Sequence, residues 1–521
     1  MNNVARYLEL RADSCPHASA IIVPQHNIIK TFEQLHQESN AVAHELSKRG
    51  INQGTRSLLM LRPSVELITI VFALFKIGAI PIIIDPGMGI KNFLNCIKVS
   101  SPEALITTPS IQLLSRIFFP YFLQIKHRIV INNHFLEALI PQSHFPLPTD
   151  LSFAPAAILF TSGSTGAPKG VCYTHEIFNA QLASIRDNFD IKPGEVDLPM
   201  LPIFALFNPA LEMATLIPEM NPSRPATVDP QKIIQSILTY QVTNSFGSPV
   251  LWHKIADYCE ACKITLPSIK RIFMAGCSVS IDLVRRYQKI IPNGIVHTPY
   301  GATEALPITS ISTKEILNQY YPSRGTCVGY PLPGNKIKVI KIRDNAINQF
   351  DASLELKTNE IGEIIVQGPV VTREYLHLPE ATHKSKIYEG SNVWHRMGDL
   401  GFMDEHGLLW FCGRKIERVE TESMTFFTDC CENVINQHPL VYRSALINVK
   451  DAPAMVIEPY QDAWPRSQKA KRSLLDQIKE LAQGHPVTRK INRFFLYKKF
   501  PVDVRHNAKI HRLTLAKYFS K

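Results

Sequence analysis

Apolar and polar positions alternate with two different periods along the first part of the chain. Residues 31–34 have the form of a capping box, and apolar residues follow with roughly helical spacing, which predicts an amphipathic helix over residues 31–49 that is ended by Gly50. The next apolar runs predict a strand, a helix and a second strand, over residues 58–61, 65–75 and 80–84. Strands that alternate with helices indicate a layered α/β architecture with mainly parallel sheets.

The length of the chain predicts more than one core. At 521 residues it exceeds the size at which a single hydrophobic core stops growing, so we expect two or more domains. The N-terminus lacks the apolar core of a signal peptide, and the most apolar stretch, residues 67–85, is interrupted by Lys76, Gly78 and Pro81. That stretch predicts a buried helix followed by a buried strand, and we expect a cytoplasmic enzyme without a transmembrane segment.

The positive charge is concentrated at the end of the chain. Residues 466–521 carry fifteen Lys and Arg against three Asp and Glu, a local charge of +12, whereas the whole chain has a net charge of +11. Such a segment is typical of a tail that binds nucleic acid or a membrane surface, or of a small basic domain that closes over an anionic nucleotide. Sparse aromatic residues and the lack of a nucleic-acid motif there favour the basic domain. A non-catalytic nucleic-acid-binding protein stays as a remote alternative.

The ten cysteines do not form the spacing of a disulfide framework. Cys259 and Cys262 have the spacing of a redox or metal motif, but no second Cys or His pair lies near them in the sequence. Two reduced cysteines on a helix are therefore the favoured interpretation, and the same holds for Cys430 and Cys431.

A loop of small and hydroxyl residues follows the apolar run 154–160 and precedes a predicted helix near His175, so we expect a strand-to-helix loop. Its candidate phosphate-binding residues are Thr161, Ser162, Gly163, Ser164, Thr165, Gly166 and Lys169. Glycines let backbone N–H groups approach an anion, and hydroxyls and a lysine add donors and positive charge. The spacing is not that of a Walker loop. Taken alone, the loop is equally typical of a flexible surface connection, but its order of residues closely resembles the phosphate loop of the adenylate-forming superfamily, which includes acyl-CoA synthetases, peptide-synthetase adenylation domains and luciferases.

Two further motifs carry the same resemblance. A predicted strand runs into a turn of small residues at Ala275, Gly276 and Cys277, and residues 300–304 read Tyr-Gly-Ala-Thr-Glu. The resemblance implies that the adenine of ATP lies against the small-residue turn and stacks on Tyr300 beside Gly301. It also implies that Thr303 hydrogen-bonds the α-phosphate and that Glu304 coordinates Mg²⁺, roles that suit a hydroxyl donor and a hard carboxylate. An ordinary turn with a solvated Glu is the alternative.

The resemblance continues to the end of the chain. It implies that Asp399 and Arg414 contact the ribose, that a large AMP-binding domain spans residues 1–413, and that residues 414–521 form a small mobile α+β cap domain. Lys509 matches the lysine that reaches into the active site during adenylation. Where relatives hold a hinge Asp or Lys this chain has Ile416, and the loop 420–425 lacks the glycine found in CoA ligases. Both departures make a role for CoA doubtful.

The segment 201–211 distinguishes subgroups of the superfamily. Many acyl-CoA synthetases carry a His where this chain has Ala205, and this segment, with its continuation to residue 225, resembles the β-lactone synthetases of long-chain olefin biosynthesis. The turn over residues 85–89 resembles that subgroup too, and it either borders an acyl pocket or is an ordinary turn.

The resemblance implies an ATP- and Mg²⁺-dependent ligase that activates a fatty acid as acyl-AMP. The catalytic residues would be Lys509, Thr303 and Glu304. For a 2-alkyl-3-hydroxy fatty acid, the substrate's own hydroxyl can then attack and close a β-lactone without CoA. The alternative is an AMP-forming long-chain fatty acyl-CoA ligase. Partners would be the small-molecule substrate and other enzymes of an olefin-type pathway.

Overall fold

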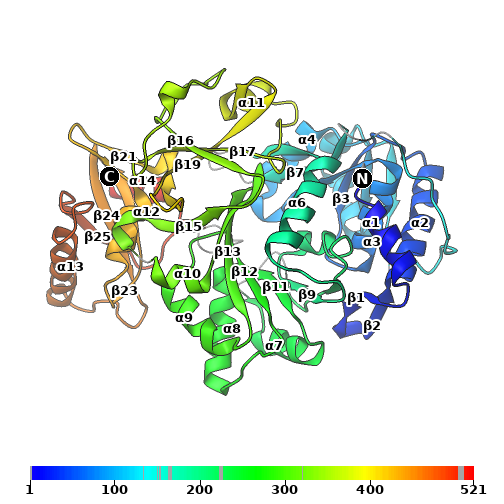
Figure 1. Cartoon of the computed structure of the whole chain (residues 1–521), viewed down its shortest axis with the longest axis horizontal. Helices are drawn as coiled ribbons and strands as arrows, with labels where there is room; N and C mark the ends of the chain where they lie inside the picture. Colours follow the sequence, from blue (N-terminus) through cyan, green and yellow to red (C-terminus); the bar gives the residue numbers. More distant parts are fainter. Residues whose placement is uncertain are drawn as a thin grey trace.

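Two large β-sheets form the frame of the molecule (Figure 1). The computed structural model describes residues 3–132, 134–149, 151, 154–161, 167–221, 227–319, 321–502 and 510–520. Within those ranges, no helix is both long enough and apolar enough to cross a membrane.

The smaller of the two sheets is built from the N-terminal third of the chain. Its first five strands are parallel, and the last is antiparallel to its neighbour. In spatial order the strands are β6 (His127–Val130), β5 (Ala104–Thr107), β3 (Arg56–Met60), β4 (Ile80–Ile83), β7 (Pro155–Thr161) and β8 (Lys169–Thr174). Its helices are α2 (Phe32–Lys48), α3 (Val65–Ile77), α4 (Ile90–Ser100) and α5 (Pro109–Ile117).

Local sequence signals set the ends of these first elements. The side chain of Thr31 accepts a hydrogen bond from the Gln34 backbone and the Gln34 side chain reciprocates, so the predicted capping box is confirmed at the start of α2. Gly50 follows the helix with a φ of 88°, a value that glycine adopts without strain. The predictions for β3, α3 and β4 are also confirmed, within two residues at each end.

The larger sheet has fourteen strands among the described residues. In spatial order they are β16 (Lys336–Ile340), β17 (Gly362–Gln367), β19 (Asn392–Met403), β20 (Leu409–Arg414), β15 (Thr326–Pro331), β14 (Ala305–Ser312), β13 (Ile295–Ala302), β12 (Arg271–Met274), β11 (Asn244–Gly247), β9 (Val196–Pro199), β10 (Ala214–Leu216), β1 (Ser19–Val23) and β2 (Ile28–Thr31), with β18 (Lys386–Glu389) paired to β19. The helices of this part of the chain are α1 (Arg6–Ser14), α6 (His175–Asn188), α7 (Pro230–Thr239), α8 (Pro249–Cys262), α9 (Ile281–Ile290), α10 (Thr313–Asn318) and α11 (Pro379–Ser385).

The prediction of mainly parallel sheets holds for only part of this larger sheet. The neighbouring strands β1, β10, β9, β11, β12 and β13 are parallel to one another. From β13 onward, each neighbouring pair in the spatial order β13, β14, β15, β20, β19, β17 and β16 is antiparallel. The change occurs at β13 because β13 turns directly into β14 and leaves no room for a crossover helix.

The Gly/Ser/Thr loop has a different setting from the one predicted. It joins β7 to β8 as the loop of an antiparallel hairpin in which Thr161 pairs with Lys169, and α6 begins at His175 only after β8. The strand-to-helix prediction was therefore wrong, because residues 169–174 pair with β7 and form a strand of their own.

The C-terminal part has a sheet and an apolar cluster of its own. Its elements are η8 (Lys415–Glu417), β21 (Val419–Glu420), β22 (Thr425–Phe426), α12 (Thr428–Ile435), β23 (Val441–Val449), β24 (Ala452–Pro459), α13 (Gln468–Gln483), β25 (Arg493–Leu496) and α14 (Arg512–Phe519). Strands β23, β24 and β25 form a three-stranded sheet, on the left of Figure 1. Buried side chains such as Val434, Leu446 and Ile478 form the cluster.

All ten cysteines are free, as predicted. Cys259 and Cys262 lie on α8, where the first is buried and the second exposed, and Cys430 and Cys431 are buried on α12.

Candidate active site

The described candidate residues line a single cavity of about 2390 Å³ that is also lined by side chains of both large sheets and of the C-terminal part. From the predicted set, the lining contains Thr161, Lys169, Ala275, Gly276, Cys277, Tyr300, Gly301, Thr303, Glu304, Asp399 and Arg414. Ser162, Gly163, Ser164, Thr165, Gly166 and Lys509 lie outside the described residues. Residues separated by more than 200 positions in the sequence therefore face one space.

The turn between β13 and β14 holds Thr303 and Glu304 at the cavity wall. Gly301 is required there because a Cβ would come within 2.6 Å of the Ala305 carbonyl oxygen. The hydroxyl of Tyr173 donates to the Thr303 carbonyl, and Thr372 donates to the Glu304 carbonyl from its backbone N at 2.9 Å and its Oγ1 at 3.0 Å. These bonds fix the backbone of the turn from outside it.

The carboxylate of Glu304 is oriented by Tyr375, whose hydroxyl donates to Oε1 at 2.7 Å. Burial, and then the charge of Glu304, raise the pKa of Tyr375, so this hydroxyl stays a proton donor. The Nζ of Lys169 lies 4.8 Å from the centre of the Tyr375 ring, a cation–π distance. One tyrosine thus connects the lysine of the β7–β8 hairpin with the carboxylate of the β13–β14 turn.

A buried lysine, Lys386, contacts the residue that holds the backbone of Glu304. Lys386 donates to the carbonyl of Thr372, the residue that holds the Glu304 backbone. Burial lowers the pKa of Lys386 to about 7, and the charge of Glu304 opposes this shift. Neither Tyr375 nor Lys386 was predicted, because each acts through contacts that no local motif marks.

Asp399 and Arg414 pair directly across neighbouring strands β19 and β20. The Nη1 of Arg414 lies 2.9 Å from Oδ1 of Asp399, and the hydroxyl of Tyr300 donates to Oδ2 at 2.7 Å. The ion pair is not aligned as a hydrogen bond, so Oδ1 keeps acceptor capacity for a ligand hydroxyl. Burial raises the pKa of Asp399, whereas the charge of Arg414 and the bond from Tyr300 oppose that rise.

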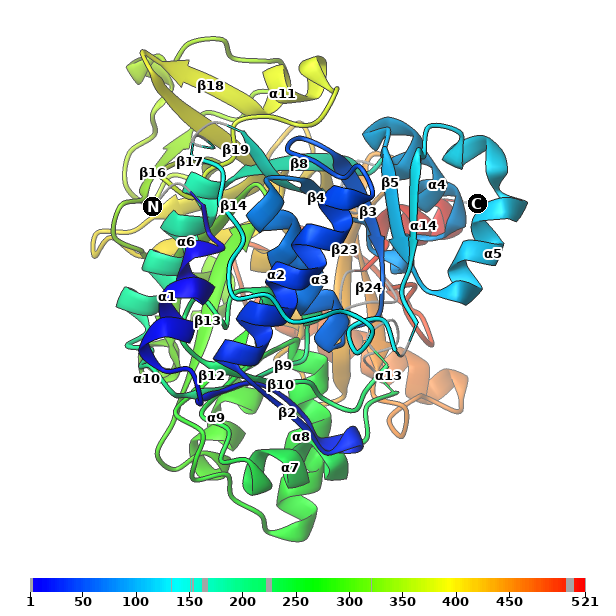
Figure 2. The same cartoon turned by 90° about the vertical axis from the view of Figure 1, so that its right-hand side faces the viewer.

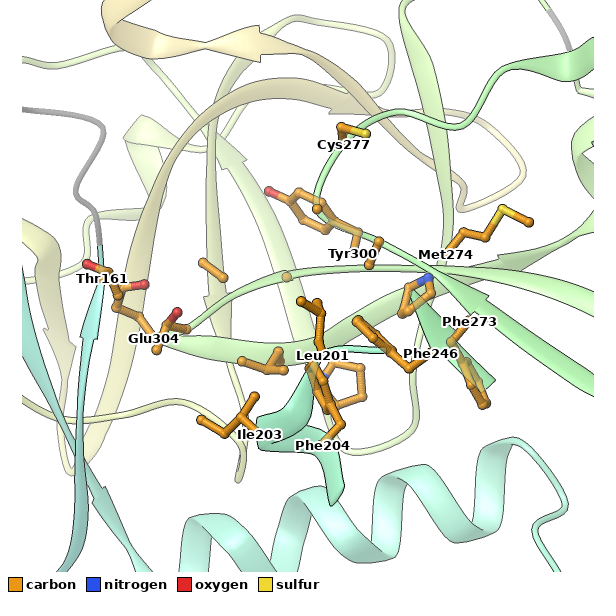
Figure 3. Close-up of a pocket in the computed structure, with 18 of the residues that line it drawn as sticks. Thr161, Leu201, Ile203, Phe204, Phe246, Phe273, Met274, Cys277, Tyr300 and Glu304 are labelled. Carbon is orange, nitrogen blue, oxygen red and sulfur yellow. The ribbon is translucent and has the colours of Figure 1, made fainter. Parts of the chain in front are cut away.

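The turn after β12 brings backbone to the cavity near Tyr300. Gly276 has a φ of 96°, which strains any residue with a side chain. Ala275 and Cys277 flank it in the cavity wall, and Figure 3 shows Cys277 close to the Tyr300 ring. The small side chains and the ring form a surface suited to a flat ligand group.

The other end of the cavity is apolar. Figure 3 shows Leu201, Phe204 and Phe246 grouped together on the side away from Thr161, with Ile203 between this group and Glu304. The rings of Phe204 and Phe246 stack with centroids 4.0 Å apart. Ala205, where many acyl-CoA synthetases carry a histidine, is buried within the core and is not among the residues that line the cavity. The cavity therefore combines a polar end with an apolar wall.

Asp85 and Asp197 are among the aspartates that line the same cavity. Asp85 accepts a hydrogen bond from the Gly87 backbone at 2.9 Å, so the predicted turn forms and borders the cavity. Asp197, on β9, accepts a bond from the Asn208 side chain at 2.8 Å, and burial raises its pKa to about 7.

The C-terminal part adds Ile510 and Arg512 to the lining. Val502 and Ile510 form an antiparallel bridge, which brings together the two ends of the segment that contains Lys509. Arg512 pairs with Glu417 at 2.8 Å and with Glu432 at 2.7 Å, so it anchors the start of α14 to η8 and α12. Arg512 was not predicted either, since only the folded chain shows its two partners.

Glu304 is the carboxylate for which the family resemblance predicts coordination of Mg²⁺. In the part of the chain that the structure describes, no group of three or more His, Cys, Asp and Glu is placed to hold a metal ion. One carboxylate is nevertheless sufficient for Mg²⁺, which is commonly held by one or two carboxylates together with water and substrate phosphates. The bond from Tyr375 engages Oε1 and not Oε2, so Glu304 fits this role.

Comparison with known proteins identifies the class that this fold and cavity represent. The AMP-binding enzyme family matches residues 8–376, and the chain belongs to that family. Within the family, the chain is 36% identical to an olefin beta-lactone synthetase from Xanthomonas campestris pv. campestris, over 99% of this chain and 97% of the relative. It is also 36% identical to an olefin beta-lactone synthetase from Stenotrophomonas maltophilia, over 95% of this chain and 92% of the relative.

The fold agrees with solved structures over its whole length. The crystal structure of ATP-bound MatB from Rhodopseudomonas palustris superimposes with a TM-score of 0.80 at 19% identity, and the match covers 100% of this chain and 99% of that one. A fatty acyl-CoA synthetase from Mycobacterium tuberculosis superimposes with a TM-score of 0.75 at 20% identity, over 100% of this chain and 99% of that one. The predicted adenylate-forming fold is thereby confirmed.

Proposed function

We propose that this protein is an ATP-dependent β-lactone synthetase that acts on 2-alkyl-3-hydroxy fatty acids. The observation that carries the proposal is the 36% identity to two olefin beta-lactone synthetases over nearly the full chain. The cavity supports it, because one space contains polar groups suited to a nucleotide and an apolar wall suited to alkyl chains.

The first step forms an acyl-adenylate. A carboxylate oxygen of the fatty acid attacks the α-phosphorus of ATP, and pyrophosphate leaves. In this proposal Lys169 and the hydroxyls of the β7–β8 hairpin hold the pyrophosphate, Thr303 donates to the α-phosphate, and Lys509 neutralises the carboxylate and the α-phosphate together. Each well-placed hydrogen-bond donor of this kind accelerates the reaction by a factor on the order of 10²–10³.

The same proposal places the nucleoside of ATP next to Asp399, Arg414 and Tyr300. Asp399 accepts hydrogen bonds from the ribose hydroxyls through Oδ1, beside Arg414, while Tyr300 and the turn at Ala275, Gly276 and Cys277 enclose the adenine. Glu304 would hold Mg²⁺, which supplies positive charge to the phosphate oxygens. Tyr375 keeps the Glu304 carboxylate in that orientation.

The second step closes the ring. The 3-hydroxyl of the substrate attacks the carbonyl carbon of the acyl-adenylate, its proton is lost, and AMP leaves with the electron pair of the broken C–O bond. Holding both groups in one molecule is equivalent to an effective concentration of about 10⁵ M or more, which offsets part of the ring strain. The exposed Ile416 and the glycine-free hairpin β21–β22 agree with a reaction that does not use CoA.

The test is a reaction with ATP, Mg²⁺ and a 2-alkyl-3-hydroxy fatty acid in the absence of CoA. We expect AMP, pyrophosphate and a product lighter than the acid by one water, measured by mass spectrometry. The matched control is the 2-alkyl acid without the 3-hydroxyl, which should support exchange of pyrophosphate into ATP but give no lactone. An absolute requirement for CoA with a thioester product would instead identify a fatty acyl-CoA ligase.

A further inference from the structure

Helix α5 presents its apolar side to solvent. Ser115 is buried, whereas Leu113, Leu114 and Ile117 are 63%, 50% and 68% exposed. An amphipathic helix on a globular protein normally buries its apolar side, so this orientation is reversed. The feature continues into η3 (Phe119–Phe122), and together these residues define the α5 surface: Leu113, Leu114, Ile117, Phe119, Tyr121 and Leu123.

The outward orientation is held by polar contacts on the inner side. The guanidinium of Arg128, on β6, donates to Ser115 Oγ at 3.0 Å and to the Phe122 carbonyl at 3.4 Å. Phe122 itself is buried, in a cluster with residues of the smaller sheet. Rolling the helix to bury its leucines would break these bonds. Large apolar side chains that are exposed next to one another are typical of an interaction surface.

The surroundings of the α5 surface are basic. Residues 86–132 contain five Lys and Arg against one acidic residue, Glu103. Lys91, Arg116 and Lys126 are exposed. Burial lowers the pKa of Arg128, and the positive charge of Arg116 lowers it further. Apolar side chains flanked by cations are complementary to a bilayer surface, where anionic headgroups lie above apolar acyl chains.

We propose that the α5 surface docks on a lipid bilayer that contains anionic phospholipids. Figure 2 shows α5 at the edge of the molecule beside α4, where a flat surface can reach it. Ile111 of α5 and Phe93 of α4 also line the large cavity, so docking brings the wall of the cavity to the membrane. A second copy of the chain fits less well, because a two-fold contact would place the same cations opposite each other.

The experiment is flotation of the full chain with vesicles of phosphatidylcholine alone and of phosphatidylcholine mixed with phosphatidylglycerol. We expect binding to the anionic vesicles that weakens with salt, and little binding to the neutral ones. The double variant Leu113→Glu, Ile117→Glu should bind the anionic vesicles at least tenfold more weakly. Arg116→Glu should weaken that binding by about fivefold or more for the lost cation alone. These side chains are exposed, so the folded state should tolerate the changes, which circular dichroism checks.

The matched control is Leu238→Glu, Leu440→Glu, which adds the same charge at exposed apolar positions 38% and 40% accessible on α7 and before β23. This control variant should bind the anionic vesicles as tightly as the wild type does. Failure of the wild type to bind anionic vesicles, or equal binding by the α5 double variant, would overturn the proposal. So would a wild-type dimer in light scattering that the α5 double variant converts to monomer, because the surface would then serve a second copy.

Discussion

At the scale of single residues, Tyr375 has the largest consequence for the site. It contacts two charged side chains in different ways, with its ring beneath the Lys169 ammonium and its hydroxyl on the Glu304 carboxylate. Glu304 lies 71 positions earlier in the sequence. If Glu304 holds Mg²⁺ and Lys169 holds pyrophosphate, as we propose, then Tyr375 sets the relative placement of both.

Tyr375→Phe separates the two contacts, because it keeps the ring and removes the donor. We expect pyrophosphate release to slow by about tenfold and to need more Mg²⁺, since a hydrogen bond to a charged group contributes about 1.5–3 kcal/mol. Tyr375→Leu should lose more, because the cation–π contact goes as well. Steady-state rates against Mg²⁺ concentration measure this. Tyr388→Phe, at an exposed position on β18, is the control, and a wild-type Mg²⁺ profile for Tyr375→Phe would contradict the assignment.

At the scale of elements, the β13–β14 turn connects the site to the fold. Gly301 lets the two strands approach, and Tyr173 of β8 and Thr372, between β17 and α11, hold the carbonyls of the turn. Thr303 and Glu304 therefore depend on backbone placement as much as on their own side chains.

Gly301→Ala should displace this turn. A Cβ would lie 2.6 Å from the Ala305 carbonyl oxygen and 2.9 Å from the Leu306 Cβ, so the strands must separate. We expect pyrophosphate release to fall by about 10²-fold, the cost of a misplacement of roughly 1 Å, while most of the far-UV circular dichroism remains. Gly484→Ala is the control, since its nearest neighbour is 3.4 Å away. Equal rates of pyrophosphate release for Gly301→Ala and Gly484→Ala would show that the β13–β14 turn tolerates the added methyl group.

The elements also show how far sequence reasoning reached. Helix α2 and the alternation β3, α3, β4 were predicted because caps and apolar periods are local signals. Strand β8 was missed because it is stabilised by pairing with β7 across a loop. The short apolar run of β8 does not by itself indicate that pairing. Tyr375, Lys386 and Arg512 were missed for the same reason: each acts on a residue that only the folded chain brings near. The candidate residues taken from family motifs line one cavity wherever the structure describes them.

At the scale of the whole molecule, the cavity is lined by both the large sheets and the C-terminal part. Arg512, at the start of α14, pairs with Glu417 and Glu432, and Asp429 of α12 accepts a hydrogen bond from Thr326 of β15 at 2.7 Å. Gly413 allows α12 to approach, because a Cβ there would lie 2.0 Å from the Thr428 hydroxyl oxygen. Residues 414–521 as a mobile cap remain a prediction.

Lys509→Ala tests the chemical contribution of the C-terminal part. A lysine aimed at substrate contributes little to the core, so we expect pyrophosphate release to fall by about 10²-fold or more with an unchanged melting temperature. Lys517→Ala, an exposed lysine on α14, should leave the rate unchanged. A normal rate for Lys509→Ala would remove this residue from the mechanism.

Asp429 makes the contact between the two parts sensitive to pH. Burial raises its pKa from 3.8 to about 7, and the hydrogen bond from Thr326 opposes this shift. Between these two values the folded state binds more protons than the unfolded state, so the contact weakens as the pH rises from about 4 to 7. Asp429→Asn keeps an acceptor for Thr326 and removes the titrating charge.

We therefore expect Asp429→Asn to be more stable than the wild type at pH 8 by about 1 kcal/mol, a few degrees in melting temperature, because the side chain keeps some access to the cavity. The difference should shrink as the pH falls toward 4, where both side chains are neutral. Asp476→Asn makes the same change of charge at an exposed position on α13 and should follow the wild-type pH dependence. A difference between Asp429→Asn and wild type that stays constant from pH 4 to 8 would mean that Asp429 ionises normally, and that the contact between α12 and β15 does not respond to pH.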